Sequence, residues 1–359
     1  SPNQLFSTVL NQIIGRSKMS SEFMSVLAQQ ELTETAESIV KHQQTNGMIL
    51  WFENSHADTW NHTEAAMALS ATGFTHNAEK AYEWLKNAQN QDGTWYHYYL
   101  KNSIEDSKVD TNCCAYVATG ILHHFLITAD RSFLEEMWPV VRSALDFVVG
   151  SQTTSGHIPW ALHSDGTPWS YSLLTGSSSI FHSLRSGLSI AQTLGIDCPQ
   201  WELSALRIAD LIAHHEDQFE PKYRWAMDWY YPVLSGAIHG EKAVTRLNEG
   251  SSKFLLADQG VKCVSDQPWV TAAETCECAL AYLATGDEHR ARQLFAATEA
   301  MRDKDGAYFT GLVYPEHITF PDGERSTYTS AAIILTADAL DNKSEASRLL
   351  IGDNIPTLR

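Results

Sequence analysis

The sequence predicts an all-α protein whose six helical hairpins close into a single ring, an (α/α)6 toroid. Three observations lead to this prediction. Two kinds of helix alternate along the chain, a short motif recurs where one kind ends, and long and short connections alternate between them. The 359 residues, of which 43% are hydrophobic, suffice for one large core.

One kind of helix is rich in Ala, Gly, Ser and Cys and carries few charges, so most of its surface can be buried. We assign six such helices to the inner ring: residues 62–73, 111–128, 177–194, 232–240, 271–285 and 326–340. The other kind is more amphipathic and is assigned to the outer ring: residues 22–45, 76–91, 132–152, 200–215, 241–256 and 288–303. An open solenoid of helical repeats is the alternative arrangement.

The recurrent motif is clearest in KAYEWLKNAQNQDGTW, residues 80–95, where an outer helix ends at Gly93 and Trp95 follows. Looser copies lie in residues 39–51, 144–160 and 295–308. Each copy places a glycine just after a helical pattern, as expected where a helix ends in a left-handed residue.

The connections differ in length according to their direction. Those from an inner to an outer helix are short, whereas those from an outer to an inner helix span residues 46–61, 92–110, 153–176, 216–230, 257–270 and 304–325. Long loops in a compact domain are usually functional or disordered. All six leave the same end of the ring, so they should surround one mouth. Eight of the eleven Trp lie in them, although these rings could also simply plug the toroid.

Five carboxylates at this mouth are candidates for catalysis: Asp58, Asp110, Asp228, Glu274 and Glu324. An acid beside an aromatic ring can have a raised pKa and act as a general acid, while a better-solvated acid stays ionised. Glycoside hydrolysis requires such a pair. Each carboxylate could instead cap a helix or form a rim ion pair, and Asp110 directly precedes an inner helix.

Aromatic and polar side chains of the same loops and helix starts are candidates for substrate binding, because rings stack on the faces of sugars. They are His56, Trp60, His62, Trp95, Tyr98, Lys108, Trp160, Trp169, Arg224, Trp225, Trp229, Tyr230, Trp269, Arg325 and Tyr328. The two arginines could bind a substrate acid or tune a carboxylate. His56 and His62 could share proton transfer.

Composition excludes several other classes of protein. A net charge of −18 argues against nucleic acid or an anionic membrane as partner. No metal or cofactor is expected, because neither zinc spacing, a phosphate loop nor a G-x-G-x-x-G motif occurs. No G-x-S-x-G motif occurs either, so we propose no nucleophile elbow. The six Cys form no disulfide framework and no export signal is evident, so we expect a cytoplasmic protein. Residues 1–18 are expected to be an N-terminal extension of a single domain, 19–359.

Two resemblances follow from these motifs. The stretch 80–95 resembles the QW motif of terpenoid cyclases and protein prenyltransferase-like toroids at Lys80, Ala81, Trp84, Leu85, Gln89, Gly93 and Trp95. In those families the motif is structural, and it therefore implies the toroid fold. The acid motif of the class II cyclases, Asp-x-Asp-Asp, is missing from this chain.

The layout also resembles the six-hairpin glycosidases, and residues 128–147 are similar to a helix pair common in glucoamylase-like enzymes. This resemblance implies hydrolysis by inversion with two carboxylic acids. We therefore predict a glycoside hydrolase that acts on a small-molecule or oligosaccharide substrate. The alternatives are an isoprenoid cyclase or transferase, a sugar epimerase or isomerase, and a non-catalytic binding module. The His-Pro-Gly-His signature of the 2-epimerases is absent from this chain.

Overall fold

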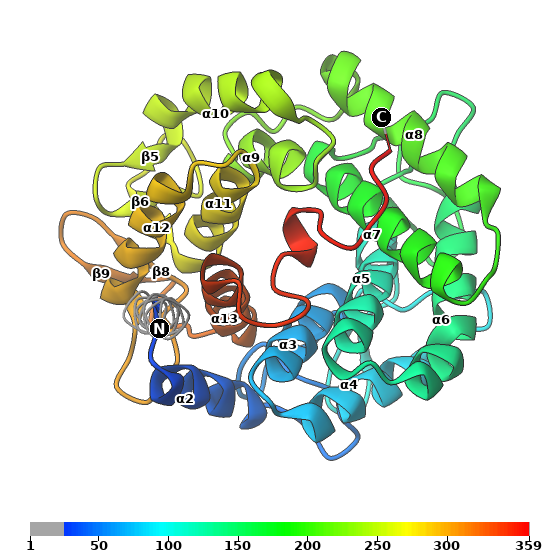
Figure 1. Cartoon of the computed structure of the whole chain (residues 1–359), viewed down its shortest axis with the longest axis horizontal. Coiled ribbons are helices and arrows are strands. Elements are labelled where there is room, and N and C mark those ends of the chain that lie inside the picture. Colours follow the sequence, from blue (N-terminus) through cyan, green and yellow to red (C-terminus); the bar gives the residue numbers. More distant parts are fainter. Residues whose placement is uncertain (1–24, 359) are drawn as a thin grey trace, which may run out of the picture.

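The computed structural model describes residues 25–358, and they form the predicted ring (Figure 1). Twelve α-helices of this part of the chain alternate between two layers. The inner helices are α3 (Thr59–Ala71), α5 (Thr111–Thr128), α7 (Leu174–Thr193), α9 (Ala226–Leu234), α11 (Ala272–Ala284) and α13 (Thr327–Asp341). The outer helices are α2 (Gln29–Val40), α4 (Thr75–Ala88), α6 (Arg131–Gly150), α8 (Pro199–His214), α10 (Gly240–Phe254) and α12 (Glu288–Ala297). The expected extension, residues 1–18, lies outside the described residues.

Burial separates the two layers as the compositions predict. Eleven of the thirteen residues of inner helix α3 are buried, against three of the fifteen residues of outer helix α10. Each inner helix packs against the next, and α13 packs against α3, so the ring is closed rather than an open solenoid. None of the described helices is long and apolar enough to cross a membrane.

The recurrent motif ties neighbouring outer helices together. Three glutamines that follow α2, α4 and α6 each donate from Nε2 to a backbone carbonyl of the next outer helix. The pairs are Gln43 with Asn77 at 2.9 Å, Gln89 with Val140 at 3.0 Å and Gln152 with Ser204 at 3.4 Å. Each Nε2 also bonds the carbonyl of the glycine that follows it in its own copy of the motif. The motif is thus a bracket between hairpins.

An arginine forms the corresponding bracket between the last and the first hairpin. Arg302 follows the 3-10 helix η2 (Thr298–Met301) and donates from Nη2 to the Glu31 carbonyl of α2 at 3.1 Å. Its Nη1 donates to Thr35 Oγ1 at 3.0 Å, and Thr35 in turn donates to the Gly306 carbonyl. These contacts join residues about 270 positions apart and close the outer ring.

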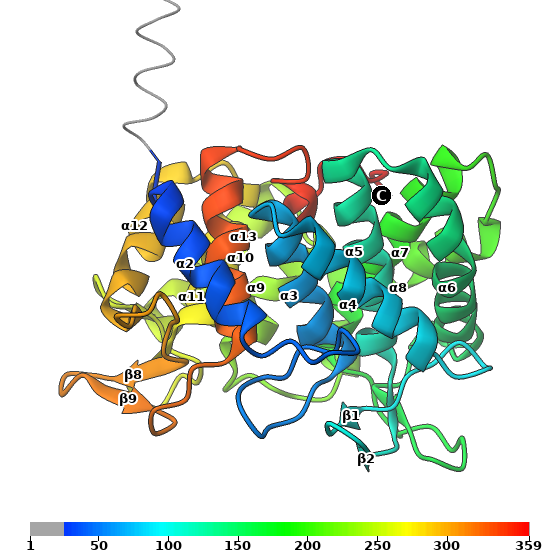
Figure 2. The same ribbon diagram turned by 90° about the horizontal axis from the view of Figure 1, so that it is seen from below.

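The long loops lie at one end of the ring (Figure 2), where they carry nine short strands. The strands are β1 (Tyr98–Tyr99), β2 (Ile104–Asp106), β3 (Val109–Asp110), β4 (Ala161–Leu162), β5 (Leu255–Leu256), β6 (Gly260–Val261), β7 (Trp269–Thr271), β8 (Gly311–Val313) and β9 (Ile318–Phe320). Pairing of β3 with β4, of β7 with β8, and of Ala57 with Tyr99 links neighbouring loops. Backbone hydrogen bonds between neighbouring loops therefore form the wall of the mouth.

One inner helix begins earlier than its sequence predicts. We expected a small, apolar helix over residues 232–240, but α9 runs from Ala226 to Leu234 and contains Pro232. Proline has no N–H to donate to the carbonyl four residues earlier, which belongs to Asp228. Arg246 replaces the missing donor, because its Nη2 lies 2.7 Å from that carbonyl oxygen. A tertiary contact thus permits the proline.

Substitution of Gly93 tests the close contact between the motif and the next outer helix. Its φ is +94°, and a Cβ placed there would lie 2.2 Å from the Ser143 carbonyl oxygen of α6. We expect Gly93→Ala to lower the free energy of unfolding by about 3 kcal/mol or more, from backbone strain and overpacking together. Gly166 is the matched control, since its φ is +87° with nothing within 4 Å. Gly166→Ala should cost only about 1 kcal/mol. Equal losses in urea unfolding would contradict the role of the close contact.

Candidate active site

Six helix N-termini converge on the mouth, because every inner helix begins at the loop end of the ring (Figure 2). The positive ends of their dipoles favour negative charge there. Four of the five predicted carboxylates lie at these helix starts. Asp58 and Asp110 cap α3 and α5, while Asp228 and Glu274 lie in the first turns of α9 and α11.

Asp58 is 5% exposed, and both of its carboxylate oxygens accept hydrogen bonds. Oδ1 accepts from the Asn61 amide and Oδ2 from the Trp51 indole nitrogen, each at 2.8 Å. Burial raises the pKa of Asp58, the two donors oppose this shift, and the nearby Asp110 charge adds to it. The net effect is a carboxylate that is more basic than an ordinary Asp.

Asp110 repeats this geometry on the next inner helix, where it accepts from the Cys113 amide at 2.9 Å and from the Trp160 indole at 3.0 Å. His97, Asp110 and Cys113 offer three ligand atoms that lie within 4.8 Å of one another and could hold a metal ion. However, both Asp110 oxygens already accept protein donors, and burial raises the pKa of the Cys113 thiol well above its usual value. The cluster is better suited to polar contacts with a substrate than to a thiolate–metal bond.

Glu274 has one donor, the Thr271 hydroxyl at 2.8 Å. Burial raises the pKa of Glu274 to about 7, and the Thr271 hydrogen bond only partly opposes the shift. Burial likewise raises the pKa of Asp228 to about 6 against the hydrogen bond from Thr175. Both groups can therefore hold a proton near neutral pH, as a general acid must.

A second layer of acids lies one turn deeper in the ring. Glu277 accepts from the hydroxyls of Tyr230 and Tyr328, and Glu64 accepts from the Tyr116 hydroxyl at 3.4 Å. Burial and mutual repulsion raise the pKa of Glu64 well above its usual value, and burial raises the pKa of Glu277 to about 7. Both line a small central cavity of about 20 Å³. Our sequence candidates omitted them, although an acid in an otherwise apolar helix such as α3 was an available signal.

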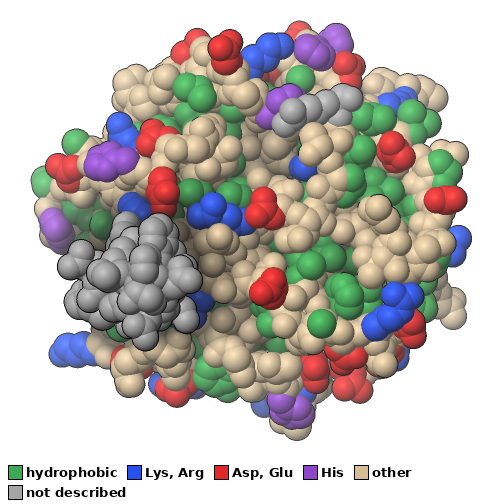
Figure 3. Space-filling model, viewed as in Figure 1, with side chains coloured by type: hydrophobic (Ala, Val, Ile, Leu, Met, Phe, Trp, Pro, Cys, Tyr) green, Lys and Arg blue, Asp and Glu red, His purple; other side chains and the backbone are tan. Residues whose placement is uncertain are grey.

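The C-terminal segment closes the ring at the opposite end. The 3-10 helix η3 (Leu349–Ile351) lies in the centre of the ring in Figure 1, and the Leu349 carbonyl lies 2.8 Å from Nε2 of His182 on α7. Leu350 lines the floor of the central cavity. Figure 3 shows this closed face, on which acidic, basic and apolar side chains are interspersed.

Several predicted binding residues lie around the mouth. Trp60 stacks on Tyr116 with ring centroids 4.2 Å apart, and its edge contacts Tyr328 at 5.5 Å. His56 stacks on Tyr98 at 4.0 Å. The other residues of this group make contacts at the rim of the mouth. Lys108 bonds Asp106, Arg224 bonds Asp266, and Trp160 makes an edge contact with Trp169. Trp269 stacks on Phe320, and Trp225 is 45% exposed.

Other predicted residues support the wall instead. We expected Trp95 to enter the mouth, but this prediction was wrong. Its side chain is 1% exposed and donates a hydrogen bond to the Leu85 carbonyl. His62 accepts from the Ile49 amide and bonds the Ala81 carbonyl, and burial lowers its pKa to about 4. Trp229 donates to the Arg246 carbonyl and stacks on Phe254. A large ring after a helix stop is equally suited to a core or a pocket, and sequence cannot decide between them.

The remaining predicted residues are held by loop contacts or, for Tyr230, by a contact between two inner helices. Glu324 accepts from the Thr310 hydroxyl at 2.8 Å, and Arg325 donates to Asp303 and Asp305 at 3.0 and 2.8 Å. Tyr230 donates to Glu277 from the deeper layer.

Asp58 and Glu274 lie on helices that flank α13 on its two sides. With neighbouring axes about 9 Å apart, helices two positions apart on a six-membered ring have axes roughly 16 Å apart. Side chains of two such helices can extend towards one another across this span. Both acids of a glycosidase must reach one glycosidic bond, and this arrangement allows Asp58 and Glu274 to do so.

The chain is similar to a known mannosidase over most of its length. The chain is 44% identical over 331 residues to an "MMP endo-(1,4)-3-O-methyl-alpha-D-mannosidase" of Mycolicibacterium hassiacum, and the match covers 92% of each chain. No family model matches.

Solved structures with low sequence identity share the fold. A D-mannose isomerase superimposes with a TM-score of 0.68 at 13% identity, covering 86% of this chain and 96% of that one. A family 63 mannosylglycerate hydrolase from Thermus thermophilus gives 0.62 at 11% identity, covering 87% and 99%. At these identities the likeness concerns the fold alone.

The pKa of Glu274 predicts how stability varies with pH. The folded-state pKa of about 7 lies above the ordinary 4.5, so the folded state binds the proton more tightly and loses stability as pH rises between these values. The shift corresponds to about 3 kcal/mol, which partial exposure reduces to about 2 kcal/mol. Glu274→Gln should therefore be more stable than the parent protein near pH 8 but not near pH 5, as measured by chemical unfolding. An identical pH dependence in both proteins would contradict the shifted pKa.

Proposed function

Because the chain belongs to the family of the MMP endo-(1,4)-3-O-methyl-α-D-mannosidase and is a glycoside hydrolase, we propose that it cleaves internal (1→4) linkages between 3-O-methyl-α-D-mannose units. The observation that carries the substrate proposal is 44% identity over 92% of both chains. An oligosaccharide is thus the partner we propose. The six free thiols are compatible with the cytoplasmic location expected from the sequence.

Within this mouth, Glu274 is our choice for the general acid. Its raised pKa keeps a proton available near neutral pH, and the Thr271 hydroxyl orients one oxygen, leaving the other free to reach the glycosidic oxygen. Asp228, with a pKa raised to about 6 but engaged by Thr175, is the second candidate for this role.

Asp58 is our choice for the general base. The Trp51 and Asn61 donors favour its ionised form, while burial makes it a stronger proton acceptor than an exposed Asp. In the proposed inverting step, Asp58 takes a proton from water as the water oxygen attacks the anomeric carbon. The glycosidic C–O bond breaks, and Glu274 gives its proton to the departing sugar oxygen.

The other acids would set the electrostatics of this step. The charge of Asp110 raises the pKa of Asp58, and the ionised acids of the mouth give it a negative potential. A negative site stabilises the positive charge that develops on the sugar ring in the transition state. The same acids count against the isoprenoid alternative, which predicts an apolar cavity with few acids. No feature of the site favours the epimerase alternative.

Kinetics of two variants test the assignment. We expect Glu274→Gln and Asp58→Asn each to lower kcat on the polysaccharide about 10²–10⁴-fold, because each removes one proton transfer. The parent enzyme should lose activity as pH rises through about 7, where Glu274 gives up its proton. Glu83→Gln, which changes an exposed acid on outer helix α4, is the matched control. Near-parental kcat in either site variant would remove that residue from the mechanism.

The configuration of the product tests inversion separately. If Asp58 activates water directly, the sugar released from an α-linked substrate must first appear as the β-anomer. Proton NMR during the first turnovers distinguishes the two anomers before they equilibrate. Initial appearance of the α-anomer would instead indicate a covalent intermediate and a nucleophilic carboxylate.

A further inference from the structure

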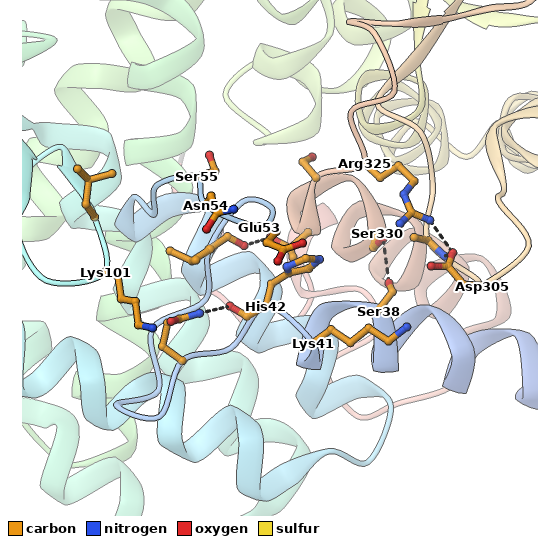
Figure 4. Close-up of a pocket in the computed structure, with 16 residues that line it drawn as sticks. Ser38, Lys41, His42, Glu53, Asn54, Ser55, Lys101, Asp305, Arg325 and Ser330 are labelled. Carbon is orange, nitrogen blue, oxygen red and sulfur yellow. Dashed lines mark hydrogen bonds and ion pairs between the residues drawn. The ribbon is translucent and has the colours of Figure 1, made fainter.

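A second and larger cavity, of about 680 Å³, lies beside the mouth (Figure 4). It lies between the C-terminal end of α2, the loop that follows α2, the turn after β1 and the start of α13. Its lining is dominated by hydroxyl, amide and charged groups, and its volume lies within the range of ligand sites in proteins. No residue of the proposed catalytic pair lines it.

Several polar groups of this cavity have no protein partner. Within residues 25–358, no hydrogen bond or ion pair engages the side chains of Lys41, Glu53, Asn54, Ser55 and Lys101. Arg325, by contrast, is neutralised by Asp303 and Asp305. Burial lowers the pKa of His42, so its neutral ring can both donate and accept. The cavity therefore offers hydrogen-bond donors and acceptors and both positive and negative side chains. Such a lining fits an uncharged polyhydroxylated ligand better than an anion.

A ridge of three rings separates this cavity from the catalytic mouth. The Trp51 indole donates to Asp58, its ring meets the edge of His56 at 4.4 Å, and His56 stacks on Tyr98. Leu50 and Ser55, which directly precede Trp51 and His56 in the chain, line the cavity. The same two loops therefore present Asp58 to one side and the cavity to the other.

We propose that this side cavity is a distal sugar-binding subsite, which a polysaccharide reaches from the mouth across the ridge of Trp51, His56 and Tyr98. The proposal rests on the endo-acting function proposed above. An enzyme that cleaves internal linkages must hold sugar units on both sides of the cleaved bond. The partly exposed rings offer apolar faces for one unit, and the unpartnered polar groups offer hydrogen bonds for the next.

Substrate length provides the test. The parent enzyme and the double variant Glu53→Ala/Lys101→Ala are compared on (1→4)-linked 3-O-methyl-α-D-mannose oligosaccharides of increasing length. We expect KM for the long oligosaccharides to rise about tenfold in the variant, which corresponds to about 1.4 kcal/mol of lost binding. The kcat, and all constants for the shortest oligosaccharide cleaved, should stay unchanged. Glu83→Ala/Lys242→Ala, two exposed residues of α4 and α10, is the matched control.

The outcomes separate the two proposals. If the parent enzyme cleaves the series but the variant shows the same KM at every length, or loses activity equally at every length, the subsite is overturned while the proposed function stands. If the parent enzyme cleaves no member of the series, the proposed function fails and the subsite with it. Calorimetry with Glu274→Gln as the background adds a binding readout, since the long oligosaccharide should bind about tenfold more weakly when the cavity is altered.

Discussion

Closure of the ring is the constraint on which the rest of this structure depends. Each hairpin buries its inner helix only if both neighbours are present, and the first and last hairpins become neighbours only when the circle closes. Packing of α13 on α3 closes the inner layer, and the contacts from Arg302 to Glu31 and Thr35 close the outer one. The glutamine brackets set the spacing of the first four outer helices.

Closure also determines where charge can gather. Strict alternation of inner and outer helices points all six inner N-termini towards the same end, and their dipoles favour carboxylates there. Burial acts in the opposite direction, since it disfavours the ionised form and raises the pKa of Glu274 and Asp228. The balance differs from one acid to the next according to its donors. Acids of the same ring can therefore take different roles in proton transfer.

Pairing between the long loops gives the mouth its shape. The bridge between Ala57 and Tyr99 and the pairing of β3 with β4 hold three consecutive loops against one another. Because the loop after α2 is anchored in this way, its two sides face different spaces. Asp58 and Trp51 belong to the side of the mouth, and Glu53 and Asn54 to the side cavity. A single loop thus connects the proposed general base to the proposed binding subsite for a longer substrate.

The sequence by itself determined the layers of the ring, the direction of its loops and most of its carboxylates, because these follow from local composition and from the period of helical burial. It also identified the glycosidase class through resemblance, which the relative of 44% identity bears out.

Only the tertiary structure decided which rings enter the mouth. Trp95 packs into the wall because its partner, the Leu85 carbonyl, and the close approach of α6 at Gly93 exist only after folding. The same holds for Pro232 within α9, where Arg246 supplies a donor from another helix, and for Glu64 and Glu277, whose proximity depends on ring closure. Contacts between residues distant in sequence leave no periodic pattern, so the burial that raises the pKa of each acid follows only from the folded ring.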